Sequence, residues 1–311
     1  MVEINNLVKS YGKFTAVNNL SLTINTGSIF GFVGPNGAGK TTTMKIMAGL
    51  MKANSGSILL DGQDITKNSN IIKEKVGYMP DFFGVYDNLK VTEYMDFYAG
   101  TYYIPYDERA ALINNLLEIV DLTDKKDFYV DALSRGMKQR LCLARSLVHD
   151  PDLLILDEPA SGLDPRARIE MKEVLKNLCT MGKTIIISSH ILPELAEMCT
   201  EVGIIDRGEM KTQGTVLEIM RALSQKRTIC IKPLNDKEGL IKVLKETPKV
   251  LDIFENEDDV EISFDGEDTD LAVLLKEIIG SGISIITFNE KQGNLEEIFM
   301  QVTGGEKDND N

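Results

Sequence analysis

The chain has 311 residues, of which 43% are hydrophobic and 26% charged, and this composition is that of an ordinary globular protein with room for about two domains. Its formal net charge is −14, with most of the excess acid beyond Gln225, which argues against a protein that binds nucleic acid through bulk electrostatics. No apolar run approaches the roughly 20 residues that span a bilayer, so any role at a membrane requires a partner.

The part of the chain from Met1 to about residue 222 alternates short β-like runs with helical segments, which predicts a parallel sheet covered by helices. The β-like runs are Ile29–Val33, Leu153–Leu156, Thr184–Ser188 and Val202–Ile205. A mainly helical stretch at about 88–148 interrupts them, because apolar residues recur at helical spacing over Val91–Tyr103 and Asp107–Val120. We therefore expect an α/β domain over 1–222 that contains a helical subdomain.

Beyond residue 222 the expected order of elements changes to β-α-β-β-α-β, which matches the small ferredoxin-like, split βαβ unit. The segments are Thr228–Lys232, Lys237–Glu246, Lys249–Phe254, Asp259–Phe264, Thr269–Gly280 and Ile283–Phe288, with Leu295–Val302 as an added helix. We expect this α+β domain over 223–303. Residues 304–311 hold no apolar side chain, so they are expected to form a disordered tail.

Residues 34–41 fit the phosphate-loop pattern G-x-x-x-x-G-K-[ST], between a predicted strand and the helix that starts at Thr41. Glycines let successive N–H groups face one point, and the helix N-terminus adds positive potential. Lys40 is expected to neutralise the β- and γ-phosphates, and Thr41 to offer a hydroxyl to Mg²⁺. The predicted nucleotide-binding residues of this loop are Gly34, Asn36, Gly37, Ala38, Gly39, Lys40, Thr41 and Thr42.

The run Leu153–Pro159 is an apolar strand that ends in two carboxylates, as expected of a buried parallel strand whose carboxyl end meets a ligand. Asp157 can hold Mg²⁺ through its water shell. Glu158 can act as the general base that polarises the attacking water. Acidic residues after a strand are often loop caps, and it is the phosphate loop elsewhere in the chain that favours the catalytic interpretation.

A second anion site is predicted in Leu133–Arg140, where the Ser134 hydroxyl and the Gly136 amide stand at the start of a helix. One nucleotide does not need two phosphate cradles. The simplest use of the second cradle is to cap the γ-phosphate held by another copy of the chain. Taken alone, the same stretch is equally consistent with an ordinary N-capped helix.

With these motifs in this order, residues 2–222 resemble the ATP-binding-cassette family, which implies ATP and Mg²⁺ as cofactors. By that resemblance Tyr11 stacks on adenine, Leu133–Gln139 is the family signature, and Ser161–Asp164 is a loop that contacts the second copy in a nucleotide-sandwich dimer. His190 is the histidine that senses the γ-phosphate and takes part in catalysis. A tyrosine face would add base stacking worth roughly 1 to 3 kcal/mol.

Two departures from the family pattern stand out. Asp81 occupies the position where the family usually has Gln, so a carboxylate takes the place expected to reach Mg²⁺, the water and the membrane partner. The signature carries Arg135 and Met137 where Gly and Gln are usual. Ser134 and Gly136 are retained, so the phosphate cap is expected to survive.

A single phosphate loop and a single signature require a second chain, and transport requires a separate integral membrane permease, with this protein peripheral on the cytoplasmic face of the membrane. The ending Asn294–Gly304 resembles that of bacterial ABC-2-type export ATPases. The expected function is therefore an exporter ATPase. An importer ATPase with a ligand-sensing C-terminal domain and a non-transport regulator that uses ATP-driven dimerisation are the alternatives.

Overall fold

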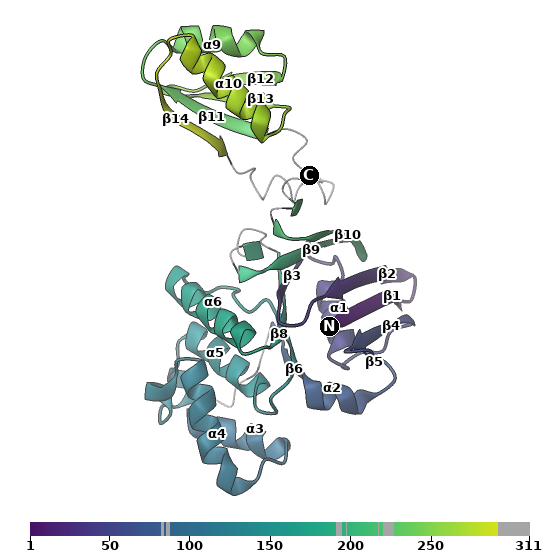
Figure 1. Cartoon of the computed structure of the whole chain (residues 1–311). Helices are drawn as coiled ribbons and strands as arrows, with labels where there is room; N and C mark the ends of the chain where they lie inside the picture. The colour runs from purple at the N-terminus through teal and green to yellow at the C-terminus, as the bar shows by residue number, and fades with distance from the viewer. Residues whose placement is uncertain are drawn as a thin grey trace, which may run out of the picture. The chain divides into compact units, whose positions relative to one another are not determined.

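The structure is a computed structural model that describes residues 1–81, 84, 88–190, 195–196, 198–216, 218–219 and 227–291. The chain divides into two compact units, Met1–Val216 and Leu217–Asn311 (Figure 1), and each has its own hydrophobic core. The predicted helix Leu295–Val302 and the predicted tail 304–311 lie outside the described residues.

A six-stranded sheet with the order β10-β9-β3-β8-β7-β6 runs through the first unit. Its strands are β3 (Ile29–Val33), β6 (Val76–Met79), β7 (Leu153–Asp157), β8 (Thr184–Ser189), β9 (Glu201–Asp206) and β10 (Glu209–Gly214). All neighbours pair in parallel except β9 and β10, which are antiparallel. Every residue of β3, β7 and β8 is buried, since both faces of a parallel sheet are covered. The four predicted strands are confirmed as β3, β7, β8 and β9.

A second, antiparallel sheet of order β2-β1-β4-β5 was not predicted. It consists of β1 (Val2–Tyr11), β2 (Phe14–Ile24), β4 (Ser55–Leu60) and β5 (Gln63–Asp64). The pairing of β1 with β2 shifts register between Ile4 and Leu7, where Asn6 has a φ of 48°. Such bulges break the strict apolar alternation by which a strand is recognised in a sequence. The sheet packs its apolar side onto the core that also contains Phe30 and Phe32 of β3.

Helices cover both faces of the six-stranded sheet. They are α1 (Lys40–Met47), α2 (Ser69–Lys75), α3 (Val91–Thr101), α4 (Tyr106–Ile119), α5 (Arg135–Ser146) and α6 (Pro165–Thr180), with the 3₁₀ turns η1 (Thr123–Lys125) and η2 (Val130–Ala132). Figure 1 shows α3 to α6 together on one side of the sheet, and α1 with the antiparallel sheet on the other. The two predicted helices of the 88–148 region are present as α3 and α4. Among the described helices, none has the length and apolarity to cross a bilayer.

The strand order places the predicted chemical groups at one edge. The central strands β3, β8 and β7 are neighbours, with Val33 opposite Ser189 and Asp157 opposite Ser188. Because they are parallel, their carboxyl ends lie side by side, which is where ligands bind in open α/β sheets. The phosphate loop follows β3, Asp157 ends β7 with Glu158 directly after it, and His190 follows β8.

The second unit has the strands and helices of a split βαβ fold. They are β11 (Arg227–Pro233), α9 (Lys237–Glu246), β12 (Val250–Glu255), β13 (Val260–Phe264), α10 (Asp268–Gly280) and β14 (Ile285–Lys291). The sheet order is β12-β13-β11-β14 with every pair antiparallel, which is the ferredoxin-like arrangement. The expected fold class is therefore confirmed. The last strand starts at Ile285 rather than Ile283, since Ile283 directly follows the turn at Gly282, whose φ is 84°.

Candidate nucleotide-binding site

The loop between β3 and α1 is shaped by glycines at positions that admit no other side chain. A Cβ atom on Gly34 would lie 2.4 Å from the carbonyl oxygen of Ile205. Gly39 has a φ of 106°, and a Cβ atom there would lie 2.4 Å from the carbonyl oxygen of Ala16. The loop is therefore held against the backbone of two other segments, and its amides lead into the N-terminus of α1, as a phosphate cradle requires.

Lys40 is nearly buried inside this loop, with 6% of its surface exposed. Its Nζ donates hydrogen bonds to the carbonyl oxygens of Gly34 and Pro35, at 2.5 and 3.1 Å. Burial lowers the pKa of Lys40, and the negative charges of Glu158 and Asp157 offset part of that effect. A cation that has already lost most of its water is well suited to meet a phosphate.

Asp157 lies at the buried end of β7 with 2% of its surface exposed, and it accepts hydrogen bonds from two hydroxyl groups. Its Oδ1 accepts from Ser188 Oγ at 2.6 Å and from Thr41 Oγ1 at 3.3 Å. Ser188 Oγ also accepts from the amide of Glu158 at 3.0 Å, so it fixes both carboxylate residues. Hydroxyl and carboxylate oxygens are the ligands that Mg²⁺ prefers, and the predicted pair Thr41 and Asp157 therefore fits this ion.

Glu158 stands in a left-handed conformation with a φ of 53°, which is uncommon for a residue other than glycine. Both of its carboxylate oxygens lie 3.2 Å from His190 Nδ1. Burial raises the pKa of Glu158, and the contact with His190 and the charge of Lys40 offset part of that rise. A partly buried carboxylate that is strained, oriented by a histidine and raised in pKa has the properties of a general base.

We expect His190→Ala to move the acid limb of the pH profile of kcat to higher pH. The contact with His190 lowers the pKa of Glu158, so losing it lets burial raise that pKa further. A base with a higher pKa is protonated, and so inactive, up to a higher pH. Steady-state ATPase rates measured between about pH 5.5 and about pH 9 would show the shift. An acid limb in His190→Ala that coincides with wild type would contradict this role.

His149 provides the matched control for that measurement. It is the other of the two histidines of the chain, and its ring stacks on Tyr102 with centroids 4.2 Å apart. Its Nε2 bonds the carbonyl oxygen of Val76 at 3.1 Å. None of these contacts involves Glu158, so His149→Ala should leave the acid limb in place.

Tyr11, the predicted adenine contact, is at the end of β1 and 47% exposed. Its hydroxyl donates to Met51 Sδ at 2.8 Å, and Lys9 Nζ lies 5.4 Å from the ring centroid. The hydroxyl is thus anchored and Lys9 lies over the ring, while much of the residue's surface stays open to solvent, an arrangement that allows a base to stack on it.

Asp81 is exposed and follows the end of β6. Tyr78 lies on that strand. Burial raises the pKa of Tyr78, and the charges of Asp157 and Asp81 both add to the rise. Because β6 pairs in parallel with β7, with Met79 opposite Leu156, Asp81 lies at the same edge of the sheet as Asp157.

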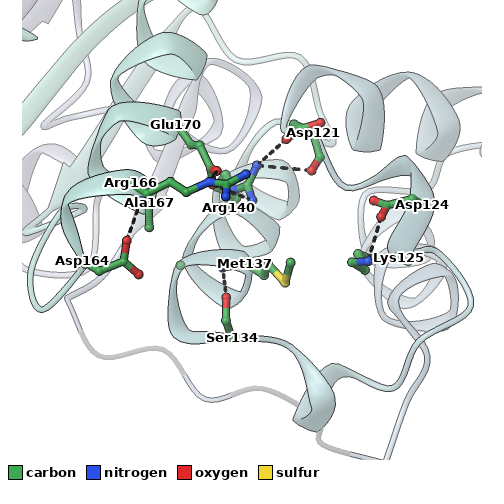
Figure 2. A pocket seen from close by; sticks show the side chains of 11 residues that line it. Asp121, Asp124, Lys125, Ser134, Met137, Arg140, Asp164, Arg166, Ala167 and Glu170 are labelled. Atoms are coloured by element: carbon green, nitrogen blue, oxygen red, sulfur yellow. Dashed lines mark hydrogen bonds and ion pairs between the residues drawn. The ribbon is translucent and has the colours of Figure 1, made fainter.

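The remaining predicted residues, Ser134, Gly136 and Asp164, gather elsewhere, around a cavity of about 480 Å³ (Figure 2). Its lining residues come from 121–140 and 164–170, and the phosphate loop is not among them. Ser134 Oγ accepts from the Met137 amide at 3.3 Å and caps α5. Asp164 caps α6 in the same way, accepting from the amide of Ala167 at 2.9 Å.

The N-cap interpretation of Ser134 and its predicted phosphate contact are compatible. As a cap the hydroxyl acts only as an acceptor, toward the amide of Met137. Its own proton is still available for donation. Ser134 is exposed, so an anion can reach it.

Comparisons with known proteins identify the family. Residues 17–161 match the family described as ABC transporter, and residues 214–303 match the DrrA1-3-like ATP-binding protein C-terminal domain. The linearmycin resistance ATP-binding protein LnrL of Bacillus subtilis is 32% identical over 98% of this chain and 98% of its own length. The chain belongs to the ATP-binding-cassette family. A Nod factor export ATP-binding protein I of Burkholderia orbicola is 39% identical over 68% of this chain and 70% of its own.

A solved structure of the ATP-binding subunit of an ABC transporter superposes with a TM-score of 0.63 at 27% identity, covering 71% of this chain and 92% of that one. The ABC protein described here is an ATP-hydrolysing subunit of the exporter branch, which confirms the expected family, reaction and nucleotide. The names of these relatives favour the exporter over the importer and regulator alternatives.

Proposed function

We propose that two copies of this ABC protein enclose ATP and Mg²⁺ between the phosphate loop of one copy and the start of α5 in the other. The observation that carries this proposal is the separation of two anion cradles within one chain. The loop 34–41 meets Asp157 and Glu158 at one edge of the sheet, whereas Ser134 and Gly136 line a different cavity. Asp164, on the rim of that cavity, is then a contact between the copies.

Within one half of this dimer the chain's own residues bind and orient the nucleotide. The amides of the loop and Lys40 hold the β- and γ-phosphates, and Tyr11 stacks on adenine. Thr41 and Asp157 hold Mg²⁺, which when bound offsets part of the phosphate charge. The serine hydroxyl and the glycine amide of the second copy meet the γ-phosphate from the opposite side.

The chemical step then uses a single base. A water oxygen attacks the γ-phosphorus while its proton passes to the Glu158 carboxylate, and the bond to the ADP oxygen breaks, giving ADP and inorganic phosphate. His190 holds the carboxylate in place through the 3.2 Å contact with its Nδ1. Lys40 and the Ser134 hydroxyl of the other copy stabilise the charge on the phosphoryl oxygens.

We further propose that the dimer sits on the cytoplasmic face of the membrane against a separate integral permease, to which we assign the choice of cargo. The export and resistance relatives support this. Affinity purification of the tagged full chain from detergent-solubilised membranes should recover one multi-span membrane protein in stoichiometric amount. Recovery of the chain without such a protein, from membranes or from the soluble fraction, would overturn the permease assignment.

We expect Asp81→Gln to leave the ATPase rate of the isolated protein unchanged and to reduce transport in the assembled complex. Lys40, Asp157, Glu158 and His190 already form a complete chemical set, and the exposed carboxylate is free to meet a basic segment of the permease. ATPase and transport assays with and without permease test this. A changed basal rate and metal preference would instead place Asp81 at the Mg²⁺ shell, and a variant that is normal in both assays would contradict both roles.

A further inference from the structure

The six residues that follow Glu158 form a tight turn that leads directly into α6. The amide of Ser161 donates to the carbonyl oxygen of Glu158 at 3.1 Å, and the amide of Leu163 to that of Ala160 at 3.3 Å. Asp164 then caps α6. Because the turn is closed onto the backbone of Glu158, a displacement of the turn must also displace the base.

This turn is held by α5, the helix that begins at the signature. Gln139 Nε2 donates to the carbonyl oxygen of Ser161 at 3.2 Å, and Gln139 is only 3% exposed. Arg135, four residues earlier and thus on the same helix face, covers Gly162. A Cβ atom at Gly162 would lie 2.5 Å from Arg135 Cζ. The signature helix therefore contacts the turn at two successive points.

Helix α5 also packs closely against α6 and bonds to the end of α4. A Cβ atom on Gly136 would lie 2.8 Å from the Cβ of Ala167, so α5 and α6 approach closely there. Arg140, 4% exposed, pairs with Glu170 of α6 at 3.1 Å and donates to the carbonyl oxygen of Val120, after α4, at 3.1 Å. Figure 2 shows Arg140 between Glu170 of α6 and Asp121, with which it also pairs at 3.1 Å. If the N-terminus of α5 moves, we therefore expect α5, α6 and the turn after Glu158 to move together.

Gln139 is an unusual choice for this buried position. Its Oε1 is buried and meets no hydrogen-bond donor within the described part of the chain. An amide left half-paired in the interior is destabilising, and an apolar side chain of the same length fills such a site at least as well. Among the residues that the structure describes, the one hydrogen bond that the Gln139 side chain makes is the one to the turn after Glu158, which points to a role in positioning.

We propose that Gln139 is a positioning residue that transmits the contact of Ser134 with the nucleotide in the second copy to Glu158 of its own chain. The proposal rests on the sandwich dimer described above. In that dimer the signature of one chain completes the site of its partner, while its Glu158 serves its own nucleotide. Through Gln139, the binding of nucleotide at one site positions the catalytic base, Glu158, at the other site.

Mixed dimers test this, with two differently tagged full-length chains isolated by successive affinity steps. One chain carries Glu158→Gln, so that only the site built on the other chain's phosphate loop hydrolyses ATP. Gln139→Met is placed either on the chain that retains Glu158 or on the chain that lacks it. In the first position we expect the turnover to fall between about tenfold and about a hundredfold, as for a slightly misplaced catalytic group. In the second position we expect turnover equal to that of the parent mixed dimer.

The expected loss is in kcat, with KM for ATP and the melting temperature unchanged, because Met keeps the shape of the side chain. Equal losses in both positions, or no loss in the first, would overturn the proposal. A lower melting temperature together with a raised KM would overturn it too, since that pattern indicates a purely structural residue. A failure of the sandwich dimer itself is distinguishable, because the parent chains would then form no ATP-dependent mixed dimer.

Discussion

Lys40→Ala is expected to abolish ATP hydrolysis and to weaken ATP binding by about thirtyfold to about 150-fold. Hydrogen bonds to a charged partner are worth about 2 to 3 kcal/mol, which corresponds to that range in Kd. The loss of turnover is larger than the loss of binding, because Lys40 also meets the charge that develops on the γ-phosphoryl group. The carbonyl oxygens of Gly34 and Pro35, now its partners, keep their place in the loop.

Calorimetric titration with Mg-ATP and a phosphate-release assay measure the two effects separately. Lys45→Ala is the matched control, since Lys45 is a basic residue in the last turn of the same helix, whereas it is Lys40 that donates to the loop carbonyls. It should bind and hydrolyse ATP as wild type does. Unchanged turnover in Lys40→Ala would contradict the assignment of residues 34–41 as the phosphate cradle.

The parts of the fold that the sequence predicts are those with a local cause. The strands β3, β7 and β8 each contain an apolar run because both of their faces are covered, and such runs are visible without any knowledge of their neighbours. The antiparallel sheet is different. The bulge near Asn6 and the further register shifts along this pair break the alternation, so β1 and β2 become recognisable only when paired.

The residues of the candidate site also divide into those that a local motif predicts and those that only tertiary structure brings together. Gly34, Gly39, Lys40 and Asp157 belong to motifs whose spacing reflects one loop or one strand end, and the structure places them together. Ser188, in contrast, touches Asp157 through the register of β7 with β8, 31 residues away in sequence. Nothing local distinguishes this serine from its neighbour Ser189.

The link between α5 and the turn after Glu158 lies further beyond sequence reasoning. Gln139 is polar at a position where the helix is buried, and that conflict is the only local signal. Its meaning depends on the carbonyl oxygen of Ser161, which only the packing of α5 against α6 brings within reach. Tertiary contacts of this kind leave no recognisable motif in the sequence.

Glu158→Gln is expected to bind ATP, to hydrolyse it about a hundredfold to about ten-thousandfold more slowly, and to accumulate as a dimer with trapped nucleotide. The amide keeps the size of the side chain and its place beside His190, but it cannot accept the proton of the attacking water. Removing a negative charge near Lys40 also favours the triphosphate. Dimerisation needs both cradles filled, and release needs cleavage, so the closed state persists.

Light scattering in the presence and absence of Mg-ATP measures this directly. Wild type should pass only transiently through the dimer, whereas Glu158→Gln should shift fully to twice the mass. Glu173→Gln, which neutralises an exposed carboxylate on α6, serves as the control and should behave as wild type. Adding Ser134→Ala to Glu158→Gln should weaken the trapped dimer while leaving ATP bound to the monomer, since it removes a hydroxyl only from the second cradle. A Glu158→Gln protein that is monomeric with ATP and hydrolyses it normally contradicts both the base and the sandwich.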